Sequence, residues 1–194
     1  MAGSARYTAV LDACVLYPAP IRDMLLSLAV EGLYHARWTD QIQNEWVDNL
    51  LQNRPDIERE KLVRTTELMT RSVLDSQIEG YESIINILQL PDPNDRHVLA
   101  AAIIGHADAI VTFNLKDFPQ DALDQYHIEA QHPDDFIANQ FELQQLAAIN
   151  ATKKMRHRLK NPPRSADDLA NKYESMALPL TAAYLRDENI RTLI

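Results

Sequence analysis

Apolar and polar positions follow one another along this chain in a pattern that predicts a parallel α/β sheet. Four short stretches carry strand patterns, and the first is apolar on both faces, as a central parallel strand should be. The stretches between them carry apolar residues at helical spacing. We expect strands at 7–16, 34–38, 109–114 and 126–130, helices at 21–30, 40–53, 56–74, 96–104 and 133–148, and a segment at 81–90 that returns the chain to the sheet.

Charge and composition divide the chain into two parts. Up to residue 150 there are 10 Lys and Arg against 23 Asp and Glu, and from residue 151 onward there are 9 against 5. The segment 153–164 is basic without an acidic residue, and two short helical stretches follow at 165–176 and 180–187. We therefore expect one domain at 1–140 and a small helical C-terminal extension at 141–194.

The totals are those of an acidic globular chain of 194 residues with a net charge of −9. The acidity argues mildly against broad nucleic-acid binding, although carboxylates that hold a cation also count as negative here. A single cysteine, Cys14, excludes an intrachain disulfide. No apolar run approaches the roughly 20 residues that span a bilayer. The first six residues carry no apolar signal core, so we expect no membrane association and a cytoplasmic protein.

The stretch Asp92-Pro93-Asn94-Asp95 puts two carboxylates at the mouth of the helix predicted at 96–104. Proline and asparagine favour a turn, and Asp95 then falls at the cap or first turn of the helix. The next strand, 109–114, ends in polar groups that are followed by Asp117. A helix, a strand and a carboxylate at the C-terminal end of the strand are how an open α/β sheet builds a site.

Acidic side chains from four elements are therefore expected to converge. They are Asp12 in the first strand, Glu45 beside the apolar stripe of its helix, Asp95, and Asn114 or Asp117 after the later strand. Oxygen ligands without histidine or cysteine suit Mg²⁺ or Mn²⁺, and such sites hydrolyse phosphodiesters. The spacing alone leaves ordinary readings open, because Asp12 could cap the strand end and Glu45 could be a surface glutamate.

The first 140 residues resemble a PIN domain, in particular the VapC-type branch of bacterial toxins. The basic and helical tail is similar to an extension found on some members of that branch. The segments that carry the resemblance are Val10-Leu11-Asp12-Ala13-Cys14-Val15-Leu16, Glu45 in its helix, Pro91-Asp92-Pro93-Asn94-Asp95-Arg96-His97-Val98-Leu99-Ala100-Ala101-Ala102 and Ile110-Val111-Thr112-Phe113-Asn114-Leu115-Lys116-Asp117-Phe118-Pro119.

The resemblance implies a three-layer α/β/α sandwich around a parallel sheet and a Mg²⁺- or Mn²⁺-dependent endoribonuclease. It implies that Asp12, Glu45 and Asp95 are the first three acids of the site. Asn114 stands where many members carry aspartate, so Asp117 or Asn114 would complete the site through water. Thr112 would orient a ligand or phosphate. The family usually forms dimers and works as a toxin beside a small antitoxin protein.

Several other residues have two interpretations. Arg22 and Arg96, near helix starts, could clamp an RNA phosphate or pair with the acids. The basic segment 153–164 is at least as consistent with a solvated linker as with an RNA contact. Cys14 is expected to be a small core residue, and His97 to serve packing or the surface.

The rival to a nuclease is a non-catalytic PIN-like module that binds protein or RNA through the same sheet. Asn114 at an acidic position favours it, whereas retention of Asp12, Glu45 and Asp95 argues against it, because buried carboxylates are costly to keep. A response-receiver domain would need an acidic pair after the first strand, and a haloacid-type phosphatase would need an aspartate at the position of Cys14. Both of these fit poorly.

Overall fold

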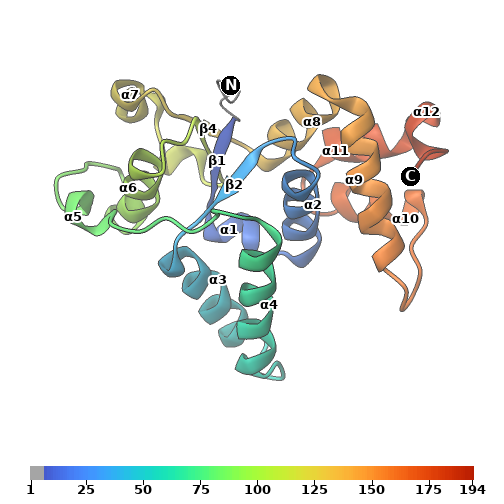
Figure 1. The fold of residues 1–194 in the computed structure, drawn as a ribbon, viewed down its shortest axis with the longest axis horizontal. Helices are drawn as coiled ribbons and strands as arrows, with labels where there is room; N and C mark the ends of the chain where they lie inside the picture. Colours follow the sequence, from blue (N-terminus) through green and yellow to red (C-terminus); the bar gives the residue numbers. More distant parts are fainter. Residues whose placement is uncertain (1–6) are drawn as a thin grey trace. The chain divides into compact units, whose positions relative to one another are not determined.

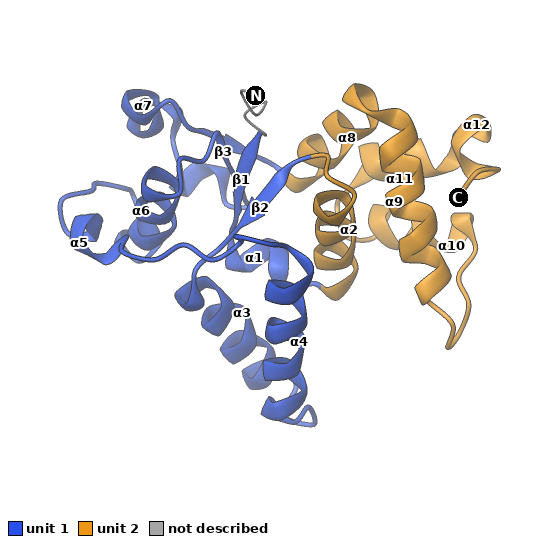
Figure 2. Cartoon of the chain, in the orientation of Figure 1, with its two compact units in different colours: residues 1–18, 34–132 blue, residues 19–33, 133–194 orange. Residues whose placement is uncertain are grey.

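The computed structural model describes residues 7–194 (Figure 1). The chain forms two compact units, coloured separately in Figure 2. The first unit contains the chain up to Pro18 together with residues 34–132, and the second contains residues 19–33 and 133–194. The helix after Pro18 is thus grouped with the C-terminal helices, and the division into domains at 1–140 and 141–194 stays a prediction.

The first unit is built on a sheet of four parallel strands in the order β2-β1-β3-β4. Ala9 lies opposite Ala36 on one side and opposite Ala109 on the other, which makes β1 and β3 the central strands. Both are almost fully buried, which explains their continuous apolar pattern. The α/β class with a parallel sheet is confirmed. The strands are β1 (Thr8–Leu11), β2 (His35–Arg37), β3 (Ala109–Val111) and β4 (Glu129–Gln131).

The first strand is shorter than the pattern predicted. β1 ends at Leu11, Asp12 keeps an extended backbone, and α1 (Ala13–Leu16) is a single helical turn. The Asp12 amide still donates to the Val111 carbonyl at 3.1 Å, but the Asp12 carbonyl already accepts from Val15 at 3.1 Å. A short apolar run cannot distinguish a buried strand from a buried helical turn. Asp12 therefore lies at the C-terminal end of β1 and not inside the strand.

Helices of the first unit place the remaining acids. Thr39 caps α3 (Asp40–Asn53) by accepting from the Ile42 amide at 3.1 Å. The alanine-rich α6 (Arg96–Ile104) packs against β1 and β3. The other helical elements of this unit are α4 (Arg59–Ser72), α5 (Glu82–Ile85), η1 (Pro93–Asp95), η2 (Leu115–Asp117), α7 (Gln120–Leu123) and η3 (Asp124–Tyr126).

The second unit is helical, and the predicted helical extension is confirmed. In it α2 packs against α9, and α11 packs against α10 and α8. The expected single helix at 133–148 is wrong, because Gln144 leaves the helical region at φ −143° and a new helix begins after it. Within residues 7–194, no helix has the length and apolarity needed to cross a bilayer. The helices are α2 (Ala19–Val30), α8 (Pro133–Leu143), α9 (Gln145–Arg158), α10 (Ala166–Glu174), α11 (Pro179–Arg186) and α12 (Glu188–Arg191).

A buried carboxylate joins two helices of the second unit. Asp134, in the first turn of α8, is 4 % exposed. Its Oδ1 accepts from the backbone amide of Thr181 at 2.8 Å and from the Thr181 hydroxyl at 2.7 Å, and its Oδ2 accepts from the Leu180 amide at 2.8 Å. Asp134 thus satisfies amides in the first turn of α11, which otherwise have no partner within their own helix.

Candidate active site

The site begins where β1 and β3 end side by side. Asp12 is 5 % exposed, and its Oδ2 accepts from the Thr112 hydroxyl at 2.7 Å and from the Cys14 thiol at 3.0 Å. The Thr112 hydroxyl in turn accepts from the backbone amide of Asn114 at 3.0 Å. One carboxylate oxygen is therefore held by two donors, which orients Asp12 before any ligand arrives. Burial, followed by the charge of Asp12, raises the pKa of the Cys14 thiol, so the thiol stays protonated and donates.

Asp95 lies half-buried at the end of η1, where α6 begins. Burial, and then the nearby charges of Asp12, Asp92 and Asp117 in that order, raise the pKa of the Asp95 carboxyl to about 6. The nearby His97 acts in the opposite direction. Three carboxylates, those of Asp12, Asp92 and Asp117, are thus close enough to repel the charge of Asp95. A cation at this place would relieve that repulsion.

This repulsion predicts how the metal-free protein responds to pH. The pKa of Asp95 is higher in the folded protein than the ordinary value of about 3.9, so its contribution to stability is fully present below pH 4. The contribution is lost as the pH rises from 4 through 6. In EDTA, Asp95→Asn should therefore equal wild type in unfolding free energy near pH 4 and exceed it near pH 7. After allowance for the half-exposed carboxyl, we expect a gain of about 1 kcal/mol.

Urea unfolding of both proteins at pH 4.5, 5.5 and 7.0 measures the effect, because the difference between them removes the titration of all other groups. Asp121→Asn, an exposed carboxylate at the start of α7, is the matched control. If the difference in unfolding free energy between Asp95→Asn and wild type does not grow with pH, the raised pKa of Asp95 is contradicted.

Glu45 reaches the same region from α3. Its Oε1 lies 2.9 Å from Nε2 of His97, which is the second residue of α6. The Glu45 side chain is 38 % exposed, whereas the His97 side chain is only 3 % exposed. The contact links the helix that carries Glu45 to the helix start that carries Asp95.

An open pocket of about 420 Å³ collects these groups. Asp12, Glu45, Asp95 and Asn114 all line it, although they come from four separate places in the chain. The expected convergence at the strand ends is therefore present in this unit. The polar wall beside the acids is formed by Tyr17, Asn49 and Asn53, and the Asn53 amide donates to the Tyr17 hydroxyl at 3.3 Å.

The remaining predicted site residues differ in how close they lie to the pocket and in how deeply they are buried. Asp117, in η2, is near enough to Asp95 to raise its pKa, while Asn114 is exposed at the pocket. Thr112 is fully buried beneath Asp12. Arg96 is the half-buried first residue of α6, directly after Asp95. Arg22 belongs to α2 and therefore to the second unit.

The donor set suits a hard divalent cation. Carboxylate and amide oxygens line the pocket, and burial together with neighbouring carboxylates raises the pKa of Asp95. No three His, Cys, Asp or Glu side chains in residues 7–194 lie as close together as in a closed metal centre. Mg²⁺ does not need such a cage, since it commonly keeps several waters and uses one or two carboxylates. The residues present therefore fit Mg²⁺ or Mn²⁺.

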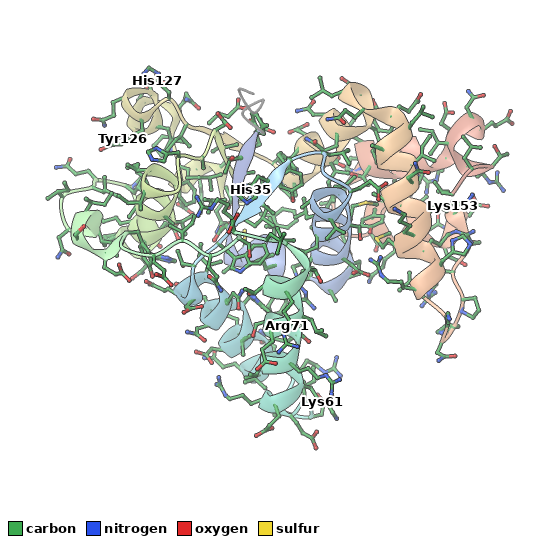
Figure 3. The ribbon with its side chains drawn as sticks, viewed as in Figure 1. His35, Lys61, Arg71, Tyr126, His127 and Lys153 are labelled. Atoms are coloured by element: carbon green, nitrogen blue, oxygen red, sulfur yellow. The ribbon has the colours of Figure 1, made fainter. Side chains whose placement is uncertain are left out.

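The basic segment 153–164 is engaged within its own unit. Up to Arg158 it is the end of α9, where Figure 3 labels Lys153, and not a linker. Lys154 lies 2.6 Å from Glu31, and Arg158 donates to Ser27 at 2.8 Å. Arg156 donates to the Arg164 carbonyl at 3.0 Å. Much of this positive charge thus holds the helices of the second unit together.

Sequence reasoning missed two partners of the acids. Cys14 was expected to be core and His97 to serve packing or the surface, but the Cys14 thiol donates to Asp12 and Nε2 of His97 lies 2.9 Å from Oε1 of Glu45. The position of Cys14, two residues after Asp12, was a usable signal, since buried carboxylates are usually hydrogen-bonded. No such signal links His97 to Glu45, which lies 52 residues earlier in the chain.

Comparison with known families identifies the class. The PIN domain family model matches residues 8–116, more than half of the chain, so this protein belongs to the PIN domain family. A second family model, described as the VapC50 C-terminal domain, matches residues 133–187. The predicted resemblance to the VapC-type branch with a C-terminal extension is confirmed.

The chain is also similar to one curated protein, "Putative ribonuclease VapC50" of Mycobacterium tuberculosis (strain ATCC 25618 / H37Rv). The two are 52 % identical over 64 residues, which is 33 % of this chain and 37 % of that protein. The match thus spans little more than a third of the length of the relative. No solved structure matches the chain.

Proposed function

We propose that this protein is a Mg²⁺- or Mn²⁺-dependent endoribonuclease, the toxin of a toxin–antitoxin pair. The observation that carries the proposal is the grouping of Asp12, Glu45 and Asp95 around one pocket at the strand ends. Membership in the PIN family and the similarity to a protein named as a ribonuclease support it. The raised pKa of Asp95 supports a cation among these acids.

Asp12 and Asp95 would hold the ion directly, because both line the pocket and the charge of Asp12 is the one that raises the Asp95 pKa most. Thr112 and Cys14 hold one oxygen of Asp12 and leave the other available. Glu45 would hold the ion as well or position the attacking water. Asp117 or Asn114 would complete the site through a water molecule.

A bound Mg²⁺ or Mn²⁺ would lower the pKa of a coordinated water and stabilise the charge on the leaving oxygen. Asp12, Glu45 and Asp95 would place the attacking water in line with the P–O3′ bond. The water oxygen would bond to phosphorus as the P–O3′ bond breaks, and the proton lost by the water would end on the 3′ oxygen. The products would carry a 5′-phosphate and a 3′-hydroxyl.

Substrate contacts are assigned by position. Asn114 is exposed at the pocket and can donate to a phosphate or base from its amide. Arg96 and Arg22 remain our proposals for phosphate clamps. Thr112 would act on the substrate only indirectly, because its hydroxyl already donates to Asp12 and accepts from Asn114.

The partners follow from the family and are part of the proposal. A small antitoxin protein would cover the site, and the protein would act in the cytoplasm. A homodimer could use α4, where Val63 is 45 % and Leu68 is 52 % exposed. Figure 3 labels Lys61 and Arg71 on the same helix.

The test is cleavage of total cellular RNA by the purified protein with Mg²⁺, with Mn²⁺ and with EDTA. Wild type should give discrete metal-dependent bands, and Asp95→Asn should give none. The control variant Asp121→Asn, which changes an exposed carboxylate at the start of α7, should cut like wild type. Lack of cleavage with either metal, by folded protein free of a copurified partner, would favour the non-catalytic module that binds protein or RNA.

A further inference from the structure

His97 is a buried polar residue on a helix that is otherwise apolar in this region. Its side chain is 3 % exposed and is followed by Val98, Leu99 and three buried alanines. Burying an imidazole is costly unless it is hydrogen-bonded. Its Nε2 has the Glu45 carboxylate at 2.9 Å, while its buried Nδ1 has no hydrogen-bond partner among the described residues. The polar contact of the His97 ring is therefore the one between Nε2 and the carboxylate of Glu45.

The contact also determines which nitrogen carries the hydrogen. Only a donor can approach a carboxylate oxygen at this distance, so Nε2 carries a hydrogen in this contact.

Glu45 needs such a partner more than the two aspartates do. Its side chain has three rotatable bonds and is 38 % exposed, so fixing one conformer costs conformational entropy. Asp12 is held by Thr112 and Cys14, and Glu45 is met in the same way by Nε2 of His97. A hydrogen bond to Oε1 would orient the carboxylate and leave its second oxygen available.

We infer that His97 is a positioning residue that holds Glu45 in the conformation in which it acts at the metal site. The inference rests on the proposed function and adds a residue to it. His97 would touch neither RNA nor the ion. It would couple α3, which carries Glu45, to the start of α6, which follows Asp95.

Two substitutions separate positioning from packing. His97→Gln keeps an N–H donor at nearly the distance of Nε2 from the backbone. His97→Leu fills much of the same space without a donor. Glu45→Gln and the double variant Glu45→Gln/His97→Leu complete a cycle that isolates the pair. Thermal melting of all variants verifies that each one folds.

The first readout is Mn²⁺ affinity by calorimetry, and the second is kcat and KM for RNA cleavage. Loss of a hydrogen-bond partner behind a metal ligand typically costs about 10- to 100-fold in affinity or activity. We expect His97→Leu to weaken Mn²⁺ binding or lower kcat by that factor with KM for RNA unchanged. His97→Gln should recover most of the loss. In the Glu45→Gln background, His97→Leu should add almost nothing.

A third readout needs neither metal nor RNA. ¹⁵N–¹H correlation spectra of the metal-free protein should show His97 with the hydrogen on Nε2, and Glu45→Gln should shift that signal. Suppose that wild type binds Mn²⁺ and cuts RNA. If His97→Leu then folds and has the same Mn²⁺ affinity and kcat as wild type, the inference about His97 is wrong. If wild type neither binds Mn²⁺ nor cuts RNA, the proposed function fails, and the positioning role fails with it even where the spectra show the contact.

Discussion

An Asp12→Asn protein should cleave RNA about a thousand-fold more slowly than wild type. The change removes one negative charge and one potential metal ligand while preserving the shape of the side chain. A bound metal contributes several kcal/mol to such hydrolysis, and each 1.4 kcal/mol corresponds to about a factor of ten in rate. The initial rate on a defined RNA fragment with saturating Mn²⁺ measures the loss.

The fold should survive this substitution. The amide oxygen of an asparagine can still accept from the Thr112 hydroxyl, which now donates to Asp12 at 2.7 Å. A melting temperature of Asp12→Asn in EDTA at or above that of wild type would verify this, because the change removes a charge that repels Asp95. Asp121→Asn again provides the control for a lost carboxylate elsewhere. A folded Asp12→Asn protein with wild-type cleavage would remove Asp12 from the site.

Asp134→Ala should destabilise the second unit by about 3 kcal/mol. The substitution removes a 4 % exposed carboxylate that accepts three hydrogen bonds from Leu180 and Thr181. It leaves two backbone amides and a hydroxyl without these acceptors, and an unsatisfied buried group costs about 1 to 3 kcal/mol. For a chain of this size, we expect the melting temperature to fall by about 6 to 12 °C.

The neighbouring Asp135 gives a matched control. It lies in the same first turn of α8 but is exposed. Asp135→Ala should therefore lose only the weak interaction of its charge with the helix N-terminus, about 0.3 to 1 kcal/mol. Equal losses for Asp134→Ala and Asp135→Ala would contradict the role of Asp134 in joining α8 to α11.

The sequence predicts those helices whose capping residue and hydrophobic period both point to the same starting position. Thr39 before the apolar stripe at 42–51 marks the start of α3, and the structure has the cap. The Asp92-to-Asp95 turn before an alanine-rich run marks the start of α6. In both cases the local hydrogen-bond chemistry and the hydrophobic period agree, so tertiary packing does not change the result.

The errors have a common cause. The apolar run 7–16 and the helical pattern 133–148 contain an internal change of conformation without a Gly or Pro to mark it. The extended backbone of Asp12 is followed directly by a helical turn from Ala13, and Gln144 breaks the helix by leaving the helical region. Such breaks are set by the packing of neighbouring elements, which a single sequence does not display.

The convergence of Asp12, Glu45 and Asp95 on one pocket follows from placing carboxylates at the C-terminal ends of parallel strands and at neighbouring helices, and their role as a site stays a prediction. Their partners were less visible. Cys14 lies two residues after Asp12 and was within reach of sequence reasoning, whereas His97 resembles an ordinary core residue and only the fold brings it to Glu45. Polar contacts between distant segments depend on topology and not on local pattern.

The chemistry at the ends of the RNA fragments tests the central claim most directly. Fragments made by wild type with Mn²⁺ would be ligated to adaptors without prior enzymatic treatment, so that only 5′-phosphates and 3′-hydroxyls react. Metal-dependent hydrolysis predicts that both ends ligate and that EDTA abolishes the fragments. Fragments with 5′-hydroxyl and 2′,3′-cyclic phosphate ends that persist in EDTA would contradict the proposed metal-dependent nuclease.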